Sequence, residues 1–153
     1  NNTTYNGGDS LLLVRGDGYV GLGTAAPTAP LHVVGAAIIT AGLTLGGTFI
    51  QGGTGAITAT SGAGAVAITG QVHEITTTGT GDALTLANGT AGQRLSIIYV
   101  AEAAGADTAI LTPTTLAGAN TTITFNALGD SVDLLYSSTG GWHIVGIFGA
   151  VVT

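Results

Sequence analysis

Short runs of alternating hydrophobic and polar residues, interrupted by glycine, asparagine and aspartate, extend along most of the chain. Alternation with a period of two is typical of β-strands, because successive side chains point to opposite faces of a sheet. The alternation is clearest at Thr121–Phe125 and Ser131–Leu134, where it places the apolar side chains of each segment on one face. Thr, Val, Ile and Gly are poor or middling helix formers, so the pattern predicts an all-β protein.

The N-terminal zone, residues 1–34, predicts a hairpin followed by an extended segment. Apolar runs at Leu11–Val14 and Tyr19–Leu22 flank the sequence Gly16-Asp17-Gly18. Asp-Gly between apolar runs is a strong hairpin signal, since both residues tolerate positive φ. Two prolines then interrupt regular pairing, and Leu31–Val34 resumes an extended strand.

The middle zone, residues 35–70, consists of short strand-like pieces separated by glycines. The pieces are Ala36–Thr40, Leu43–Leu45, Thr48–Gln51, Ala56–Thr60 and Ala65–Thr69. Small residues dominate them, so no piece buries both of its faces within one chain. We therefore expect this zone to form an intertwined trimeric β stalk, in which strands from three copies wrap around a shared axis.

The C-terminal zone, residues 71–153, has longer and more regular strand patterns. They are Val72–Thr77, Ala83–Ala87, Arg94–Ala101, Thr108–Thr112, Thr121–Asn126, Ser131–Ser137 and Trp142–Phe148. Turn residues follow each of them. Short strands at this spacing predict a small antiparallel β-sandwich or jelly-roll-like head.

The charge of the chain excludes several classes of partner. Charged residues make up 7% of the sequence, Lys is absent, and the formal net charge is −6. Nucleic-acid and anionic-membrane binding need clustered cations, so neither is expected. No apolar run reaches the roughly 18 residues of a membrane-spanning helix, and we expect no membrane insertion. Without Cys there are no disulfides or thiolate metal sites, and we expect no cofactor.

The ends of the sequence carry little information about processing. Asn1–Ser10 has no signal-peptide pattern, and the chain contains no Met. We therefore expect residue 1 to be a processed or otherwise defined start.

The carboxylates do not form a catalytic pattern. Four aspartates lie beside glycine or in turn-like sequence, and we expect their side chains to hydrogen-bond to turn backbone. These are Asp17, Asp82, Asp107 and Asp130. Among the remaining acids no pair has the convergent spacing of a glycosidase, and Gly-x-Ser-x-Gly is absent. We predict that the protein is not an enzyme.

The histidines and aromatic residues are the other candidates for a site. His32, His73 and His143 lie far apart in sequence, which disfavours zinc, although a trimer would bring three copies of one histidine together. The site residues we select for ligand binding are Trp142, Tyr136 and Tyr99. Exposed aromatics bind carbohydrate or protein receptors, whereas buried ones would serve only as core.

Arg15-Gly16-Asp17 spells a tripeptide that integrins recognise. Integrin binding would require this tripeptide on a protruding loop. The turn chemistry already accounts for each of the three residues, so we favour a hairpin turn.

The segment Arg15–Val34 resembles a segment of bacteriophage tail fibres and related trimeric fibre proteins, with the form D-G-x-V-G-I-G-T-x-x-P followed by L-x-V. The matching residues are Asp17, Gly18, Val20, Gly21, Gly23, Thr24, Pro27, Leu31 and Val33, with Leu22 in place of Ile. Residues 92–146 are similar in pattern to the β-rich terminal domains of phage fibres.

The resemblance implies a structural fibre or spike protein, located on a virion and hence extracellular. Its partners would be two further copies of the chain, other virion proteins, and a glycan or protein on a host surface. The alternatives are a fibre protein that decorates a capsid, and a prokaryotic adhesin or filament subunit. A polysaccharide depolymerase ranks last.

Overall fold

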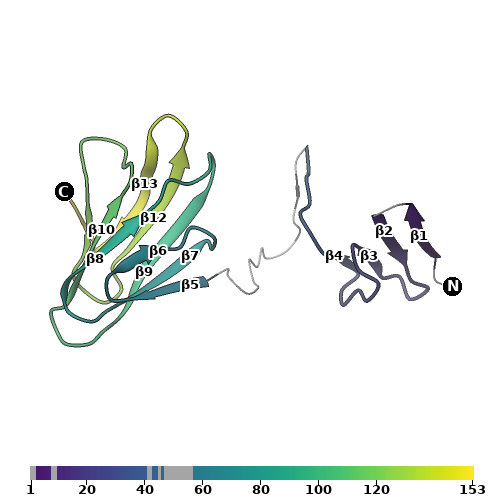
Figure 1. Cartoon of the computed structure of the whole chain (residues 1–153), viewed down its shortest axis with the longest axis horizontal. Helices are drawn as coiled ribbons and strands as arrows, with labels where there is room; N and C mark the ends of the chain where they lie inside the picture. Colours follow the sequence, from purple (N-terminus) through teal and green to yellow (C-terminus); the bar gives the residue numbers. More distant parts are fainter. Residues whose placement is uncertain (1–2, 8–9, 41–42, 45, 47–56) are drawn as a thin grey trace. The chain divides into compact units, whose positions relative to one another are not determined.

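The structure is a computed structural model that describes residues 3–7, 10–40, 43–44, 46 and 57–153. All regular structure in the described residues is β-strand, which confirms the all-β prediction. Because these residues contain no helix, they contain none that could cross a membrane. The chain forms two compact units, Asn1–Phe49 and Ile50–Thr153 (Figure 1).

The N-terminal unit is a single sheet with the strand order β1-β2-β3-β4. Its strands are β1 (Thr3–Gly7), β2 (Ser10–Val14), β3 (Val20–Leu22) and β4 (Leu31–Val33). The first three pair antiparallel, and β4 pairs parallel to β3. The predicted hairpin is confirmed as β2–β3, and β1 was not predicted from the sequence.

Two glycines of the fibre-like segment allow the chain to turn tightly after β3. A Cβ atom on Gly21 would lie 2.5 Å from the carbonyl oxygen of Thr24, and one on Gly23 would lie 2.5 Å from that of Val34. Gly23 also has a φ of +73°, a conformation that costs other residues about 1–2 kcal/mol. Both positions therefore require glycine for a local steric reason, because a side chain at either one would clash with a backbone carbonyl.

The C-terminal unit is a two-layer sandwich of two five-stranded sheets. We call them sheet B, with the order β13-β12-β9-β7-β5, and sheet C, with the order β14-β11-β10-β8-β6. The strands of sheet B are β5 (Ile57–Ser61), β7 (Val72–Thr77), β9 (Arg94–Glu102), β12 (Ser131–Ser137) and β13 (Gly141–Phe148). Those of sheet C are β6 (Gly64–Val66), β8 (Thr80–Leu86), β10 (Thr108–Pro113), β11 (Ile123–Phe125) and β14 (Val151–Val152).

The prediction of an antiparallel sandwich was wrong for half of this unit. From β5 to β10 the chain alternates between the two sheets, so each sheet receives every second strand and neighbouring strands run parallel. Only β11 to β14 add antiparallel pairs. The turns that follow the predicted strands mostly carry the chain from one layer to the other.

The predicted boundary at residue 70 lies inside this unit. Strands β5 and β6 come from the predicted stalk zone, but they pair with β7 and β8, and Val66 is buried. The expected strand Ala36–Thr40 is not a strand, and Ile38 is 89% exposed. The expected strand Thr48–Gln51 lies outside the described residues, as does part of Leu43–Leu45.

The core lies between sheets B and C and uses the inward-facing alternate residues of both. The fully buried side chains include Ile75, Leu84, Leu95, Ile97 and Leu111. The predicted alternation of β11 and β12 is confirmed, because the residues expected on one face are buried; they are Ile123, Phe125, Val132 and Leu134. Burying one such side chain contributes about 1.5–3 kcal/mol, so the core is the main source of stability of this unit.

Gly23→Ala should loosen the N-terminal unit. The added methyl group would clash with the Val34 carbonyl at a positive φ, and we expect a loss of at least about 1–2 kcal/mol. Hydrogen exchange of the β3 amides should then accelerate. Gly46→Ala is the control, because its methyl group would meet no atom within 4 Å. Equal acceleration in both variants would contradict the steric explanation.

Candidate functional site

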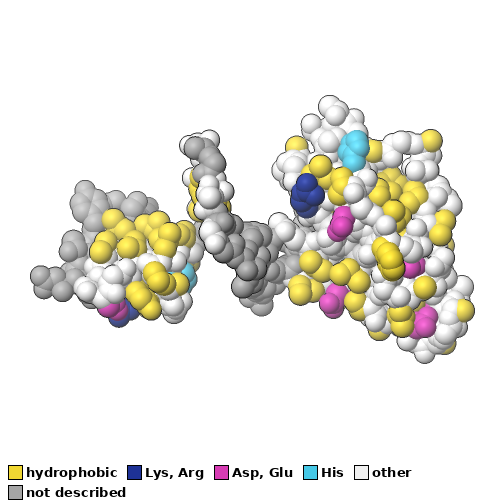
Figure 2. Space-filling view, turned by 180° about the vertical axis from the view of Figure 1, so that it is seen from behind, with side chains coloured by type: hydrophobic (Ala, Val, Ile, Leu, Met, Phe, Trp, Pro, Cys, Tyr) yellow, Lys and Arg dark blue, Asp and Glu magenta, His cyan; other side chains and the backbone are white. Residues whose placement is uncertain are grey.

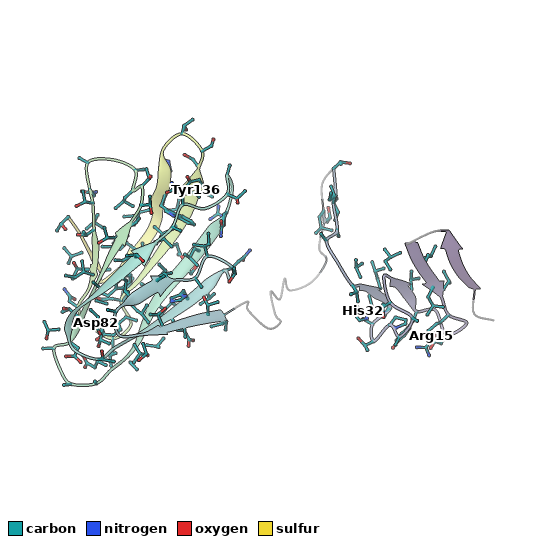
Figure 3. The ribbon with its side chains drawn as sticks, in the orientation of Figure 1. Arg15, His32, Asp82 and Tyr136 are labelled. Carbon is teal, nitrogen blue, oxygen red and sulfur yellow. The ribbon has the colours of Figure 1, made fainter. Side chains whose placement is uncertain are left out.

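Two of the three aromatic residues selected for ligand binding lie in the core. Tyr99 and Trp142 are both 0% exposed. The indole NH of Trp142 donates to the carbonyl oxygen of Ala87 at 2.9 Å, and its ring meets Tyr136 edge-on at 5.2 Å between centroids. Tyr136 is half-buried beside it, near one end of the sandwich (Figure 3). The alternative interpretation, core packing, therefore holds for Tyr99 and Trp142.

The hydroxyl group of Tyr99 is satisfied inside the sandwich. It shares a hydrogen bond of 2.6 Å with Thr77 and donates to the carbonyl oxygen of Asp107 at 3.2 Å. Burial raises the pKa of this hydroxyl, so it stays protonated. The residue links the core to the loop after β9.

The prediction that four aspartates stabilise turns is confirmed. Asp17 accepts from the backbone NH of Tyr19, Asp82 from that of Thr78, and Asp107 from that of Ala104. Asp130 is buried and accepts from two backbone NH groups, those of Asn126 and Ala127. Figure 3 places Asp82 at the end of the sandwich away from Tyr136. These carboxylates serve separate turns and do not converge.

The three histidines lie in three different surroundings. His32 accepts from the backbone NH of Thr28 in the N-terminal unit, and exposed His143 bonds to Ser137. His73 is buried between the layers. The described residues include no group of three or more His, Asp or Glu side chains that could hold a metal ion.

His73, on β7, forms hydrogen bonds with two residues of the edge strand β5. Its Nδ1 lies 2.6 Å from the hydroxyl oxygen of Thr58, and its Nε2 lies 2.9 Å from that of Thr60. Thr60 also donates to the carbonyl oxygen of Ala65 in the facing sheet. This contact was not predicted, because the two threonines lie outside the predicted head zone.

Arg15 is held within its own turn. Its guanidinium forms an ion pair of 2.8 Å with Asp17 and lies 5.5 Å from the centre of the Tyr19 ring. The β2–β3 turn is closed by two backbone hydrogen bonds, from Arg15 to Tyr19 and from Gly18 to Arg15 (Figure 3). The arginine and aspartate of the tripeptide therefore contact each other within the hairpin turn.

One face of the N-terminal sheet consists of aliphatic side chains. We call it the aliphatic face; its six residues are Leu12, Val14, Val20, Leu22, Leu31 and Val33, which stand opposite one another in register. Leu12, Val14 and Leu22 are 37–42% exposed, and Leu31 is 62% exposed. Hydrophobic side chains gather visibly on this unit in Figure 2.

The opposite face of the same sheet is covered. Leu13 is 5% exposed, and Gly21 and Pro27 are buried. The hydrogen bond from Thr28 to His32 holds the β3–β4 loop over this side. The loop thus supplies one covering layer, and the aliphatic face has no such layer among the described residues of its unit.

The outer faces of the two sandwich sheets differ in charge. On sheet C two rows of side chains follow the register, and neither contains a charge. The first row is Ala65, Thr85 and Thr112; the second is Ala83, Ile110, Thr124 and Val151. Sheet B carries Glu74, Arg94 and Asp133 on its outer face.

Two hollows meet at Arg94. One, of about 270 Å³, lies between the loops before β7 and β9 and is lined by residues such as Gln71 and Gln93. The other, of about 340 Å³, lies on sheet B beside the β-bulge of β12 and β13 and includes Ser96, Asp133 and Val145. Arg94 could have been chosen from the sequence as a candidate site residue, since it is one of only two Lys or Arg residues in the chain.

The chain matches no protein-family model, and no curated protein is significantly similar to it. The fold and surfaces therefore define its class only in structural terms. It is an all-β protein with a single-layer sheet and a two-layer sandwich.

Trp142→Ala should destabilise the sandwich by about 3–5 kcal/mol, because it removes a fully buried aromatic side chain and leaves a cavity. Urea unfolding followed by far-UV circular dichroism measures the loss, since the variant has no tryptophan fluorescence. Phe148→Ala is the control on β13, where the ring is 72% exposed, and it should cost less than about 1 kcal/mol. A small effect at Trp142 would be inconsistent with its place in the core.

The stability of the sandwich should decrease in mild acid because of His73. Burial lowers the pKa of this histidine below its ordinary value of about 6.5. Below that pH the unfolded chain binds a proton that the folded chain resists, so the free energy of unfolding falls as the pH drops, by at most about 1.4 kcal/mol per pH unit. Above about pH 6.5 the free energy of unfolding keeps its full value, because the histidine is neutral in both states.

Urea unfolding between about pH 7.5 and pH 5.5, the range in which an ordinary histidine titrates, measures this dependence. His73→Gln should flatten it, whereas His143→Gln, at an exposed histidine of the same sandwich, should leave it unchanged. An unchanged slope in His73→Gln would refute the assignment.

Proposed function

We propose that the protein is a structural, self-associating fibre or spike protein of a virion, with three copies forming the assembly. The N-terminal part joins the copies, and the C-terminal sandwich is a head that attaches to a ligand on a host surface. The single observation that carries the self-association is the aliphatic face. Four of its six residues lie in the segment that resembles trimeric phage fibres.

A single-layer sheet with an apolar face needs a partner. Sheets in stable domains bury an apolar face against another layer, and large exposed apolar patches mark interaction sites. The aliphatic face presents six such side chains in direct register. Copies of the same chain offer the same chemistry and are present at the same place, so a second and a third copy are the natural covering layers.

Exposed apolar residues continue beyond β4. Val34, Ile38, Ile39 and Leu43 are between 53% and 89% exposed. Three copies in cyclic symmetry would bury these residues together with the aliphatic face. Closed symmetry also removes open-ended contacts that would otherwise lead to aggregation.

A prokaryotic adhesin or filament subunit is the second candidate, and the uncharged outer face of sheet C favours it. A chain with self-association surfaces on both units can add copies without forming a closed ring, and such open-ended addition gives filaments. The capsid-decorating alternative shares the same surfaces. Its copies would be located on the shell in images of the virion.

Light scattering on the full chain tests the proposal. We expect a discrete species of three times 14.8 kDa. Leu31→Glu should shift it toward smaller species, because it places a charge on the aliphatic face, where the side chain is 62% exposed. Leu128→Glu, at an exposed leucine of the other unit, is the matched control and should keep the wild-type mass.

A folded monomer at micromolar concentration would overturn the proposal. Growth into particles without a fixed mass would favour the filament alternative instead. A trimer that Leu31→Glu leaves intact would show that the aliphatic face is not the interface.

A further inference from the structure

Arg94 is the single cation of the C-terminal unit, whose other charged side chains are six carboxylates. It is exposed at the start of β9. The one ion pair between described residues is that of Arg15 and Asp17, and no hydrogen bond of the Arg94 guanidinium occurs in the described part of the chain. Its donors are therefore available to a ligand.

The surroundings of Arg94 supply hydrogen-bonding groups of both kinds. On sheet B the carboxylate of Asp133 accepts from the hydroxyl of Ser96 at 2.5 Å, and the aliphatic side chain of Val145 lines the same hollow. On the other side, the amide of Gln93 is fixed by bonds to Thr90 and Ile68. The walls of both hollows are thus held by internal bonds.

These groups select for a particular ligand chemistry. A planar guanidinium binds a carboxylate through two parallel hydrogen bonds. Asp133 accepts from hydroxyl groups, and its negative charge repels phosphate or sulfate more strongly than a single carboxylate, because those anions carry more charge. The larger hollow, about 340 Å³ in volume, is near the lower end of small-molecule sites, which span about 300–1,000 Å³.

We propose that Arg94 and the two hollows beside it bind the carboxylate of an acidic sugar, with Asp133 accepting from the sugar hydroxyls. This assignment deepens the proposed attachment function and rests on it for the source of the sugar, but it does not depend on the number of copies. Arg94 lies between the hollows, so a sugar unit in either one places its carboxylate within reach.

Saturation-transfer NMR on the full chain tests the assignment, with D-glucuronate as the probe and D-glucose as its neutral counterpart. We expect transfer to glucuronate with a Kd of about 1 mM, the range of weak single-site binding, and little transfer to glucose. Arg94→Gln should weaken glucuronate binding by at least about tenfold, since it removes a charge-assisted hydrogen-bonding group. Added salt should weaken the wild-type signal.

Arg15→Gln is the matched control, because it removes the other arginine of the chain and should leave binding unchanged. Absent transfer to glucuronate in the wild type, or equal binding by Arg94→Gln, would overturn the assignment. If inorganic phosphate at equal concentration competes with glucuronate, the site binds anions in general, and the sugar assignment is overturned. The mass of each sample, from light scattering, separates a failure of self-association from a failure of binding.

Discussion

A β-sheet has two faces, and the apolar residues of each face need a covering layer; this constraint organises the whole chain. In the C-terminal unit sheets B and C cover each other, and alternate residues such as Leu84 and Ile97 meet in one core. In the N-terminal unit a loop covers the side of Leu13. The opposite, aliphatic face receives no layer from the described part of its unit, and this is the ground on which we propose that copies of the chain cover it.

The sequence predicted the strands well because it contains two independent local signals, alternation and turn residues. Both signals agree at Ser131–Ser137, which is a strand with those bounds. They are weak at β1 and at the two-residue β14, which were missed. Direction of pairing was not predictable, since a glycine turn of two residues at Gly62 looks the same whether the chain returns within one sheet or crosses to the other layer.

Burial explains why the candidate site differed from the prediction. Trp142 was selected for ligand binding, but its ring is buried where Gly89 leaves room for it: a Cβ atom on Gly89 would lie 2.9 Å from the indole. Such an approach between distant segments leaves no local trace in sequence. The case of Arg94 is the reverse. Its residue type was conspicuous in a chain without Lys, but its two hollows are formed by loops and strands that meet only in the fold.

The placement of the carboxylates gives the two faces of the sandwich different capacities. Asp82 lies near the start of β8, and Asp107 and Asp130 lie in loops; the side chains of all three accept from backbone NH groups. The net negative charge is thereby kept away from the outer face of sheet C, whose threonine hydroxyls and small apolar groups are suited to contact with protein. Sheet B keeps its charges on its outer face, and a polar ligand needs such groups. Under the proposed function, the outer face of sheet B would recognise the ligand and the uncharged outer face of sheet C would be free to contact other copies, although both sheets are built on the same alternation.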